Sequence, residues 1–239
     1  MGAPEQIFTI KRVSFSRLME FENCAHATKL KVIDKIPEPE RPLPPGKTEH
    51  ANDRGSRIHD GCEMYVRGKA DLPAEAAKHF QDEFESLRKR FIEGKVSLEG
   101  EWGFTVDWEP CDYNDPSVWI RVKADAVIHL SKTHAVVVDY KTGRKFGNEV
   151  KHGEQVQLYA VALMLRHPEL QKIEVELWYL DQDDLTHSAK PVEKWLRHLK
   201  PFDSRFKRMS LEKRFKANPS KFTCKYCSYK GNACKFGVV

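Results

Sequence analysis

The sequence has no apolar run near the roughly 18 residues that a membrane-spanning helix needs. Its N-terminal segment, MGAPEQIFTIKR, lacks the apolar core of a secretory signal peptide. We therefore expect a cytoplasmic protein without a membrane partner. The glycine-rich phosphate loop of ATP-driven motors is also absent from the sequence. We infer that the protein acts alone or with separate partner proteins.

What the chain does contain fits a globular protein with a sizeable core. Of its 239 residues, 40% are hydrophobic and 31% are charged. The net charge is only +5, but residues 200–239 hold 11 Lys and Arg against Asp203 and Glu212. A cationic C-terminal segment of this kind indicates a polyanionic partner such as nucleic acid, or else only a basic, solubilising surface.

Hydrophobic spacing predicts helices first, then strands, then helices again. A helix is expected from Ser14 or Ser16, followed by a proline-rich loop over 36–50. Further helices are predicted over 51–67, 73–93 and 153–166, and strands over 99–108, 118–130, 134–140 and 173–180. Basic helices are expected over 188–217, and residues 222–236 are too rich in Cys and Gly for helix or strand. The order predicts an α/β fold with a central mixed sheet flanked by helices.

The valine-rich strand 134–140 runs into Asp139, Tyr140 and Lys141. Because side chains alternate along a strand, Asp139 and Lys141 are expected on one face and Tyr140 on the other. Their Cα atoms would lie roughly 6.5 Å apart, too far for a tight ion pair but suited to a metal ion and a polarised water. The preceding strand adds Asp125, and two neighbouring carboxylates resist joint ionisation unless a cation is bound. Hard oxygen ligands favour Mg or Mn. The alternative is that these residues simply end two strands.

Two helical pairs could complete such a site. Gly55 lies one turn before His59, which we expect to leave room for an imidazole that binds metal. Gln155 and Tyr159 are four residues apart and share one helix face just after the 139–141 strand end. They could support the metal site or contact phosphate, or they could be packing residues only. Glu101 in EGEWGF could add another carboxylate to the sheet.

The set Gly55-x-x-x-His59, Asp125, Asp139-Tyr140-Lys141 and Gln155-x-x-x-Tyr159 resembles the RecB-type nucleases of the PD-(D/E)xK superfamily. The order and spacing match over roughly residues 14–236. The resemblance implies a restriction-endonuclease-like core in which His59, Asp125, Asp139 and the Tyr140 carbonyl bind Mg or Mn. Family members often carry Gly shortly before the first acid, where this chain has Val122 and Lys123; we expect this difference to affect DNA contacts.

By the same resemblance, each site residue has an expected role. Lys141 would orient the attacking water and offset charge in the transition state, and Gln155 and Tyr159 would shape the site and contact DNA. Metal would lower the pKa of bound water so that hydroxide attacks phosphorus.

Six cysteines are present, and a cytoplasmic protein makes disulfides improbable. Cys224-x-x-Cys227 with Cys234 is typical of metal ligation, but supplies three of the four thiolates that such a site usually needs. The tail could be a zinc site completed by a His, or its cysteines could be uncoordinated. Cys62 and Cys111 are expected to be buried or free thiols.

The resemblance extends to iron–sulfur members of this nuclease class, including CRISPR-adaptation nucleases and AddB-type helicase–nuclease subunits. In these proteins one Cys precedes the core and three follow it. Cys24, in SFSRLMEFENCA, matches the leading one. The resemblance thus implies a 4Fe–4S cluster held by Cys24, Cys224, Cys227 and Cys234, with zinc as the less favoured occupant. Such a cluster would join the two chain ends across the nuclease core.

We therefore expect a single nuclease domain over 1–239, with a helical part (14–96), a catalytic sheet core (97–180), and basic helices with a cysteine tail (181–239). The expected activity is divalent-metal-dependent exonuclease action on single-stranded DNA or DNA ends, in recombination, repair or phage DNA processing. The host would be a bacterial, archaeal or phage-infected cell, with a separate helicase, recombinase or CRISPR-adaptation partner. Alternatives are a CRISPR-adaptation-type nuclease and a non-catalytic iron–sulfur DNA-binding module on a nuclease fold.

Overall fold

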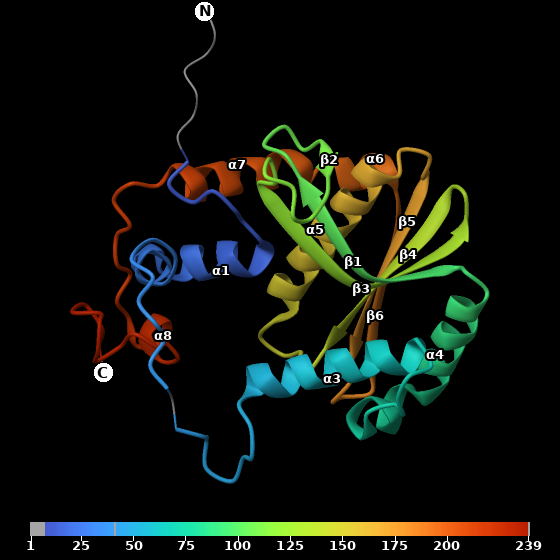
Figure 1. Cartoon of the computed structure of the whole chain (residues 1–239), viewed down its shortest axis with the longest axis horizontal. Helices are drawn as coiled ribbons and strands as arrows, with labels where there is room; N and C mark the ends of the chain where they lie inside the picture. Colours follow the sequence, from blue (N-terminus) through green and yellow to red (C-terminus); the bar gives the residue numbers. More distant parts are fainter. Residues whose placement is uncertain (1–7, 41, 239) are drawn as a thin grey trace, which may run out of the picture.

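A mixed β-sheet lies at the centre of the molecule, with helices on both faces (Figure 1). The computed structural model describes residues 8–40 and 42–238. Residues 1–7, the first part of the N-terminal segment MGAPEQIFTIKR, lie outside this range. Within this described part the sheet has six strands in the order β2-β1-β3-β4-β5-β6. Their bounds are β1 Val96–Phe104, β2 Pro110–Cys111, β3 Ile120–Ser131, β4 His134–Lys141, β5 Lys172–Tyr179 and β6 Asp184–Pro191.

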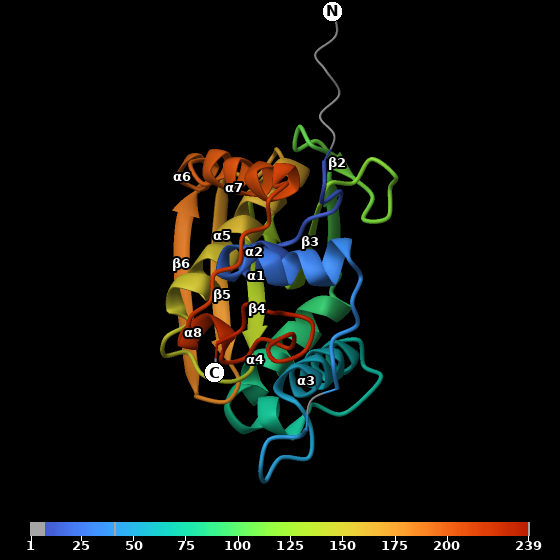
Figure 2. The same ribbon diagram turned by 90° about the vertical axis from the view of Figure 1, so that its left-hand side faces the viewer.

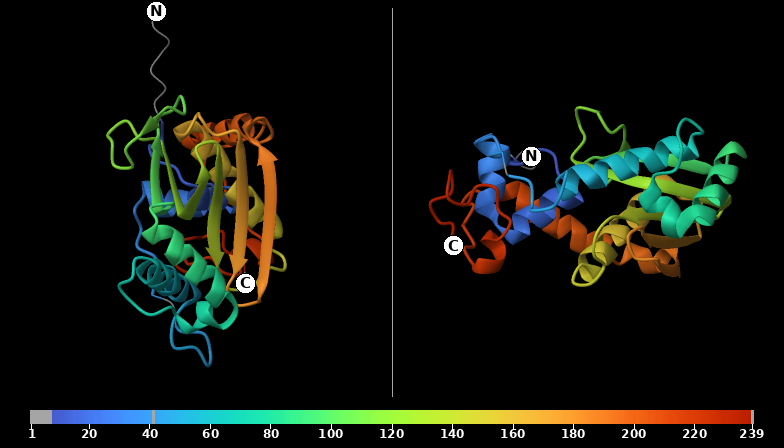
Figure 3. Two further views of the ribbon diagram at one scale, coloured as in Figure 1. Left: turned by 90° about the vertical axis from the view of Figure 1, so that its right-hand side faces the viewer. Right: turned by 90° about the horizontal axis from the view of Figure 1, so that it is seen from below.

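The two faces of the sheet are buried by different helices. On one face pack α1 (Phe15–Asn23), α5 (Glu149–Arg166), α6 (Val192–Leu196) and α7 (Leu199–Leu211), whose apolar side chains form one continuous core with alternate strand residues. The other face is covered by α3 (Ala51–Val66) and α4 (Ala74–Ile92), which form a second core (Figure 3). Burial of both faces explains why β4 reads as an almost continuous run of valines.

The catalytic strand end predicted from the sequence lies at the parallel part of the sheet. β4 pairs with β3 in antiparallel fashion and with β5 in parallel fashion. Two neighbouring parallel strands need a crossover connection, and α5 provides it. The chain therefore leaves β4 at Lys141, turns, and runs back along α5, which brings the first turns of this helix near the end of β4.

The N-terminal helices and the C-terminal tail lie together on one side of the sheet (Figure 2). Here α1 continues into α2 (Ala25–Thr28) and a single π-helical turn, η1 (Lys29–Ile33), and the tail carries α8 (Lys221–Cys224). The Asn218 side chain donates to the Asn23 carbonyl at 3.0 Å, and the Tyr229 hydroxyl donates to the Ile36 carbonyl at 2.9 Å. These contacts span more than 190 residues of sequence, so the tail is folded onto the N-terminal helices.

Most predicted elements are confirmed, and the differences have simple causes. The α/β class with a mixed sheet is correct, and Ser14 caps α1 by accepting a hydrogen bond from the Arg17 amide. The expected basic helix starting at residue 188 is wrong at its beginning, because residues 184–191 form the edge strand β6. Its polar sequence, DLTHSAKP, packs only at the sheet edge and so lacks the apolar alternation of a half-buried strand. The tail also contains the short helix α8, which was not predicted.

In the described part of the chain, no helix has the length and apolar character required to cross a membrane.

Candidate active site

Asp139 and Lys141 form the centre of the site at the end of β4. Val136, Val138 and Tyr140 belong to the core beneath α3 and α4, so alternation turns Asp139 and Lys141 toward the α5 face. The Lys141 ammonium lies 2.5 Å from Asp139 Oδ2. The expectation that these residues are too far apart for a tight pair is therefore wrong, because the four-carbon lysine stem bends back over the strand.

Asp125 of β3 lies directly beside Asp139. Ala126 pairs with Val138, and Asp125 and Asp139 are the next residue on each strand. One oxygen of Asp125, Oδ2, accepts a hydrogen bond from the Tyr140 amide at 2.6 Å. The other, Oδ1, lies 3.0 Å from His59 Nδ1 on α3. Asp125 thus connects the end of the catalytic strand to the helix that carries the histidine.

The protonation of this group follows from burial and from its neighbours. Burial raises the pKa of Asp139 and outweighs the opposing ammonium of Lys141, and the nearby charge of Asp125 raises it further. Burial lowers the pKa of His59, but the charges of Asp125 and Asp139 outweigh this effect, so that its pKa is raised overall. The site therefore holds excess negative charge that protons or cations neutralise.

Gln155 and Tyr159 of α5 complete a ring of polar contacts with Asp139 and Lys141. The Lys141 ammonium donates to Gln155 Oε1 at 2.8 Å, and Gln155 Nε2 donates to the Tyr159 hydroxyl at 2.6 Å. The Tyr159 hydroxyl in turn lies near Asp139, close enough for this carboxylate to raise the pKa of the phenol. Burial and the charges of Asp139 and Asp125 hold the pKa of this phenol well above its usual value, so Tyr159 is a hydroxyl donor. The predicted i, i+4 pair therefore reaches the strand end.

Gly55 has a different neighbour from the one expected. A Cβ added at Gly55 would lie 3.2 Å from the Thr142 hydroxyl oxygen, so the missing side chain makes room for the residue after Lys141. No side-chain atom of His59 lies within 4 Å of that Cβ, so the expectation that Gly55 makes room for the imidazole is wrong. Glu101 is exposed on β1 opposite Lys123, two residues along β3 from Asp125, and lies outside the ring of contacts.

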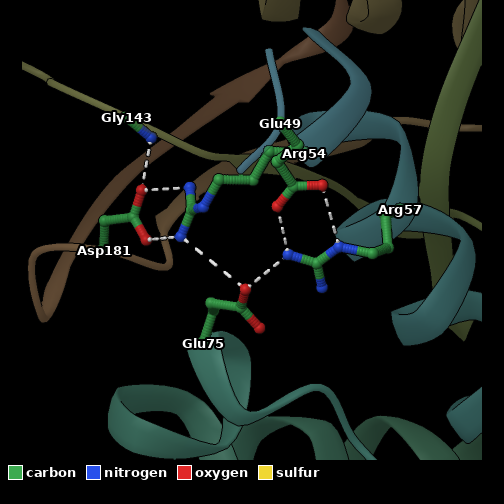
Figure 4. A network of polar contacts seen from close by, with 6 residues as sticks. All are labelled: Glu49, Arg54, Arg57, Glu75, Gly143 and Asp181. Atoms are coloured by element: carbon green, nitrogen blue, oxygen red, sulfur yellow. Dashed lines mark hydrogen bonds and ion pairs between the residues drawn. The ribbon is translucent and has the colours of Figure 1, made fainter. Parts of the chain in front are cut away.

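Residues that the sequence interpretation missed hold the turn after the catalytic strand (Figure 4). Arg54 of α3 makes a two-pronged contact with Asp181, at 2.9 and 2.8 Å, just beyond β5. Asp181 also accepts a hydrogen bond from the Gly143 amide at 2.6 Å. This arrangement fixes the turn between β4 and α5 to the helix that carries His59. Arg54 precedes Gly55 in the sequence, but its partner lies 127 positions away, which no local pattern reveals.

Beside this contact lies a second arginine with its own partners. Arg57 binds Glu49 of the loop before α3 and Glu75 at the start of α4, both at 2.7 Å. Arg54 approaches the same Glu75 at 4.0 Å. Arg57 therefore belongs to the surface that joins α3 and α4, and among the described residues it makes no hydrogen bond or ion pair with the turn after β4.

The donor chemistry at the site suits a hard divalent cation. The carboxylates of Asp125 and Asp139 and the imidazole of His59 come from β3, β4 and α3. Asp139 is buried beside the Lys141 ammonium and the Tyr159 phenol. Among the described residues, no three or more His, Cys, Asp or Glu side chains are arranged as a ready metal-binding group. In this structure the acids are instead paired with His59 and Lys141. The ligand set of His59, Asp125, Asp139 and the Tyr140 carbonyl stays a prediction.

The four cysteines predicted as cluster ligands face one space. Cys24, Cys224, Cys227 and Cys234 all line a cavity of about 870 Å³ between the tail and the N-terminal helices. All four are free thiols. The other two lie elsewhere: Cys62 is buried in α3, where burial raises the pKa of its thiol, and Cys111 lies in β2.

The family described as the PD-(D/E)XK nuclease superfamily matches residues 12–235, and this chain belongs to it. A search of curated proteins gives no significant match.

Similar solved structures are distant. One is SSO0001, with 15% identity and a TM-score of 0.47 over 100% of this chain and 90% of that chain. Another is a protein from Eubacterium rectale, provisionally described as an exonuclease, with 12% identity and a TM-score of 0.44 over 88% and 86%. A phage-related exonuclease from Haemophilus somnus 129PT has 11% identity and a TM-score of 0.31 over 83% and 93%. Similarity at this level supports no statement about activity.

Proposed function

We propose that this protein is a divalent-metal-dependent DNA nuclease that hydrolyses phosphodiester bonds at the end of β4. The observation that carries the proposal is the closed set of contacts from Lys141 through Gln155 and Tyr159 to Asp139, beside Asp125. A lysine and two acids need no such arrangement to end a strand. Membership of the nuclease superfamily supports the same reading.

Mg or Mn would be held by His59, Asp125, Asp139 and the Tyr140 carbonyl. A bound cation would lower the pKa of water and offset the charge that develops on phosphate. Burial and the charge of Asp125 raise the pKa of Asp139, and the charges of both acids raise the pKa of His59. A bound cation would compensate this negative charge. Asp125 would also keep His59 oriented through its 3.0 Å contact with Nδ1.

Lys141 would act on the water and the phosphate, and Gln155 and Tyr159 would hold it in place. Lys141 is held by Gln155 and Asp139, so its ammonium has a fixed position from which to orient water and stabilise negative charge. Gln155 positions Lys141 by accepting a hydrogen bond from its ammonium, and Tyr159 positions Gln155 by accepting a hydrogen bond from its side-chain amide. We propose that this chain of contacts keeps the ammonium aligned when a cation replaces it beside Asp139.

The proposed substrate is a DNA end, and the proposed reaction is exonucleolytic. Support comes from the Gln155-x-x-x-Tyr159 feature, which resembles end-processing members of the RecB-type nucleases. Recombination, repair or phage DNA processing would supply such ends. A CRISPR-adaptation nuclease is the second candidate, and it is favoured by the placement of one cysteine before and three after the core.

The test uses end-labelled linear DNA and closed circular DNA, each single- and double-stranded, with Mg or Mn. We expect metal-dependent loss of linear substrate with little effect on circles. Cleavage of circles at an equal rate would contradict exonuclease action while leaving nuclease activity intact. No cleavage of any substrate by protein purified without oxygen would favour a DNA-binding module without catalysis.

We further propose that Cys24, Cys224, Cys227 and Cys234 hold a 4Fe–4S cluster, with zinc as the alternative occupant. Support comes from the donor set, because four thiols from both ends of the chain line one cavity. The hydrogen bonds from Asn218 to Asn23 and from Tyr229 to Ile36 hold the tail against the N-terminal segment that carries Cys24. When bound, the group would supply a covalent connection between the two chain ends.

A further inference from the structure

The tail exposes aromatic side chains that the proposed active site and cluster do not use. Phe222 of α8 is 92% exposed, and Tyr226 just beyond it is 76% exposed. Neither packs into a core, although most large apolar side chains of the described part do. Lys225 lies over the Tyr226 ring at 5.1 Å. Two flat rings held on the surface beside lysines have the chemistry of a platform for planar ligands.

The charged side chains of the tail segment that carries these rings are all positive. Basic residues of α7 are largely neutralised: Arg205 and Arg208 bind Glu22, and Lys207 binds Asp203. After Glu212 the sequence contains no Asp or Glu but seven Lys and Arg: Lys213, Arg214, Lys216, Lys221, Lys225, Lys230 and Lys235. In the part of the chain that the structure describes, none of these seven takes part in an ion pair. The tail therefore presents free positive charge.

The tail rings also border a cavity that reaches the start of α5. Phe222 and Tyr226 line the 870 Å³ cavity together with Asn148 and Lys151, which lie at the start of α5. The two acids of this cavity wall, Glu20 and Glu38, are both paired with Lys31. The cavity thus joins the basic tail to the helix whose next turns carry the site.

Helix geometry continues the path from the cavity to Lys141. Lys151, Gln155 and Tyr159 are spaced four residues apart on α5, so they follow one face at steps of about 6 Å. Gln155 contacts Lys141 directly. In the turn before the helix, Phe146 is 87% exposed and precedes Asn148 by two residues. A strand lying on Phe222 and Tyr226 therefore has a polar and aromatic track toward the end of β4.

We propose that Phe222 and Tyr226 stack on the bases of single-stranded DNA and that the tail lysines contact its phosphates, so that the strand is led along α5 to the active site. This inference rests on the proposed function and adds the residues that bind the strand outside the active site. Single-stranded DNA is favoured over a duplex because paired bases are already stacked and hide their faces. Charge complementarity favours nucleic acid over an apolar peptide.

The test is binding of a fluorescent oligothymidine strand, followed by anisotropy with EDTA present so that no cleavage occurs. We compare wild type with Phe222→Ala and Tyr226→Ala, and with Ile92→Ala, which truncates an apolar side chain 77% exposed at the end of α4. Each tail variant should bind at least about fivefold more weakly, as expected for one lost stacking contact. Ile92→Ala should bind like wild type. Because both rings are exposed, their removal leaves the core intact.

A strand of the same length without bases separates stacking from charge. Wild type should bind this abasic strand more weakly than oligothymidine, and Phe222→Ala should bind it as wild type does. Equal affinity of wild type for the two strands, or an equal loss for Phe222→Ala on both, would overturn the proposal. Cleavage is measured separately with metal, so loss of the nuclease proposal and loss of the stacking proposal give different results.

Discussion

Lys141 is the residue on which the charge balance of the site depends. Its ammonium is the cation nearest to the buried Asp139 and is also a donor to Gln155. Without it, Asp139 and Asp125 would be neighbouring carboxylates with only His59 to balance them. Removal of one partner from a buried pair leaves an uncompensated charge, which costs more than the pair contributes.

We predict that Lys141→Met lowers the free energy of unfolding by about 3 kcal/mol at pH 8 in metal-free buffer. Burial already raises the pKa of Asp139, and loss of the opposing ammonium raises it further. A carboxyl group whose pKa is raised in the folded state destabilises the fold above its ordinary pKa, and this penalty fades as the pH falls and the group is protonated. The deficit should therefore shrink toward pH 4.

Urea unfolding at several pH values measures this difference. Lys132→Met, which alters an exposed lysine in the turn between β3 and β4, is the matched control and should show little change at any pH. A deficit for Lys141→Met that grows on acidification would contradict the charge balance described here.

At this scale the sequence predicted which residues meet but not how they pair. The alternation of a strand and the i, i+4 spacing of a helix are sufficient to bring Asp139, Lys141, Gln155 and Tyr159 together. The ion pair and the hydrogen-bonded ring depend on how long flexible side chains settle, which backbone spacing does not determine. The same limit explains the mistaken role of Gly55, whose neighbour Thr142 comes from another element.

At the scale of elements, the site depends on the fit between α3 and the turn after β4. Arg54 and Gly143 meet on the same carboxylate, Asp181. The arginine fork holds this carboxylate with a charge-assisted, two-pronged geometry and lowers its pKa. We infer that Arg54 is a positioning residue that keeps His59 in register with the end of β4.

We predict that Arg54→Ala lowers kcat by about tenfold or more with a smaller change in KM, since misplacement of reacting groups affects the chemical step most. Arg57→Ala is the matched control, because Arg57 lies on the same helix as Arg54 but binds Glu49 and Glu75 instead of the turn. Steady-state cleavage kinetics measure both variants. Equal losses in kcat for the two would show that the network only supports the fold.

The cysteine tail provides a prediction at the same scale. Cys227→Ala should remove the visible absorbance and bound iron of protein purified without oxygen, and should lower its melting temperature. The structural reason is that Cys227 shares its cavity with Cys24, Cys224 and Cys234. Cys111→Ala, in β2, should keep both properties. Bound zinc in place of iron in the wild type would favour the alternative occupant, and unchanged metal content in Cys227→Ala would contradict the assignment.

Long, periodic elements were predictable, and the sheet edge was not. The two cores on either side of the sheet require apolar side chains at regular spacing. The sequence shows this spacing in α3, α4, α5 and the central strands. The edge strand β6 instead has a mostly exposed, polar sequence, and it is a strand because β5 offers it a complete ladder of backbone partners. Tertiary pairing of this kind cannot be seen in a local pattern.

At the scale of the whole molecule, folding brings the basic tail to a cavity that it shares with the start of α5. The sequence predicted a cationic end of the chain, but the structure divides it into a neutralised helix, α7, and a tail with free charge. Arg205 illustrates this: its contacts with Glu22 and Glu154 join α7 to α1 and α5. Charge on the tail is therefore available for binding, whereas charge on α7 stabilises the fold.

We predict that the affinity for single-stranded DNA falls steeply with salt and that the Lys221→Gln, Lys225→Gln double variant has a shallower dependence. Each lost phosphate contact should reduce the slope of log affinity against log salt by about 0.7. Anisotropy titrations at several salt concentrations measure the slope. Lys132→Gln, on the turn between β3 and β4, should leave it unchanged; an equal reduction for both variants would contradict a specific role of the tail.

The central claim is that a metal-dependent nuclease site lies at the end of β4, and one measurement tests it most directly. Cleavage of end-labelled linear single-stranded DNA is followed with Mn, for wild type beside Asp139→Ala, with circular dichroism showing that both are folded. The account predicts cleavage by wild type that stops on chelation of the metal, and no cleavage by Asp139→Ala. Cleavage by the folded variant at the wild-type rate would show that Asp139 and its contacts with Lys141 are not the active site.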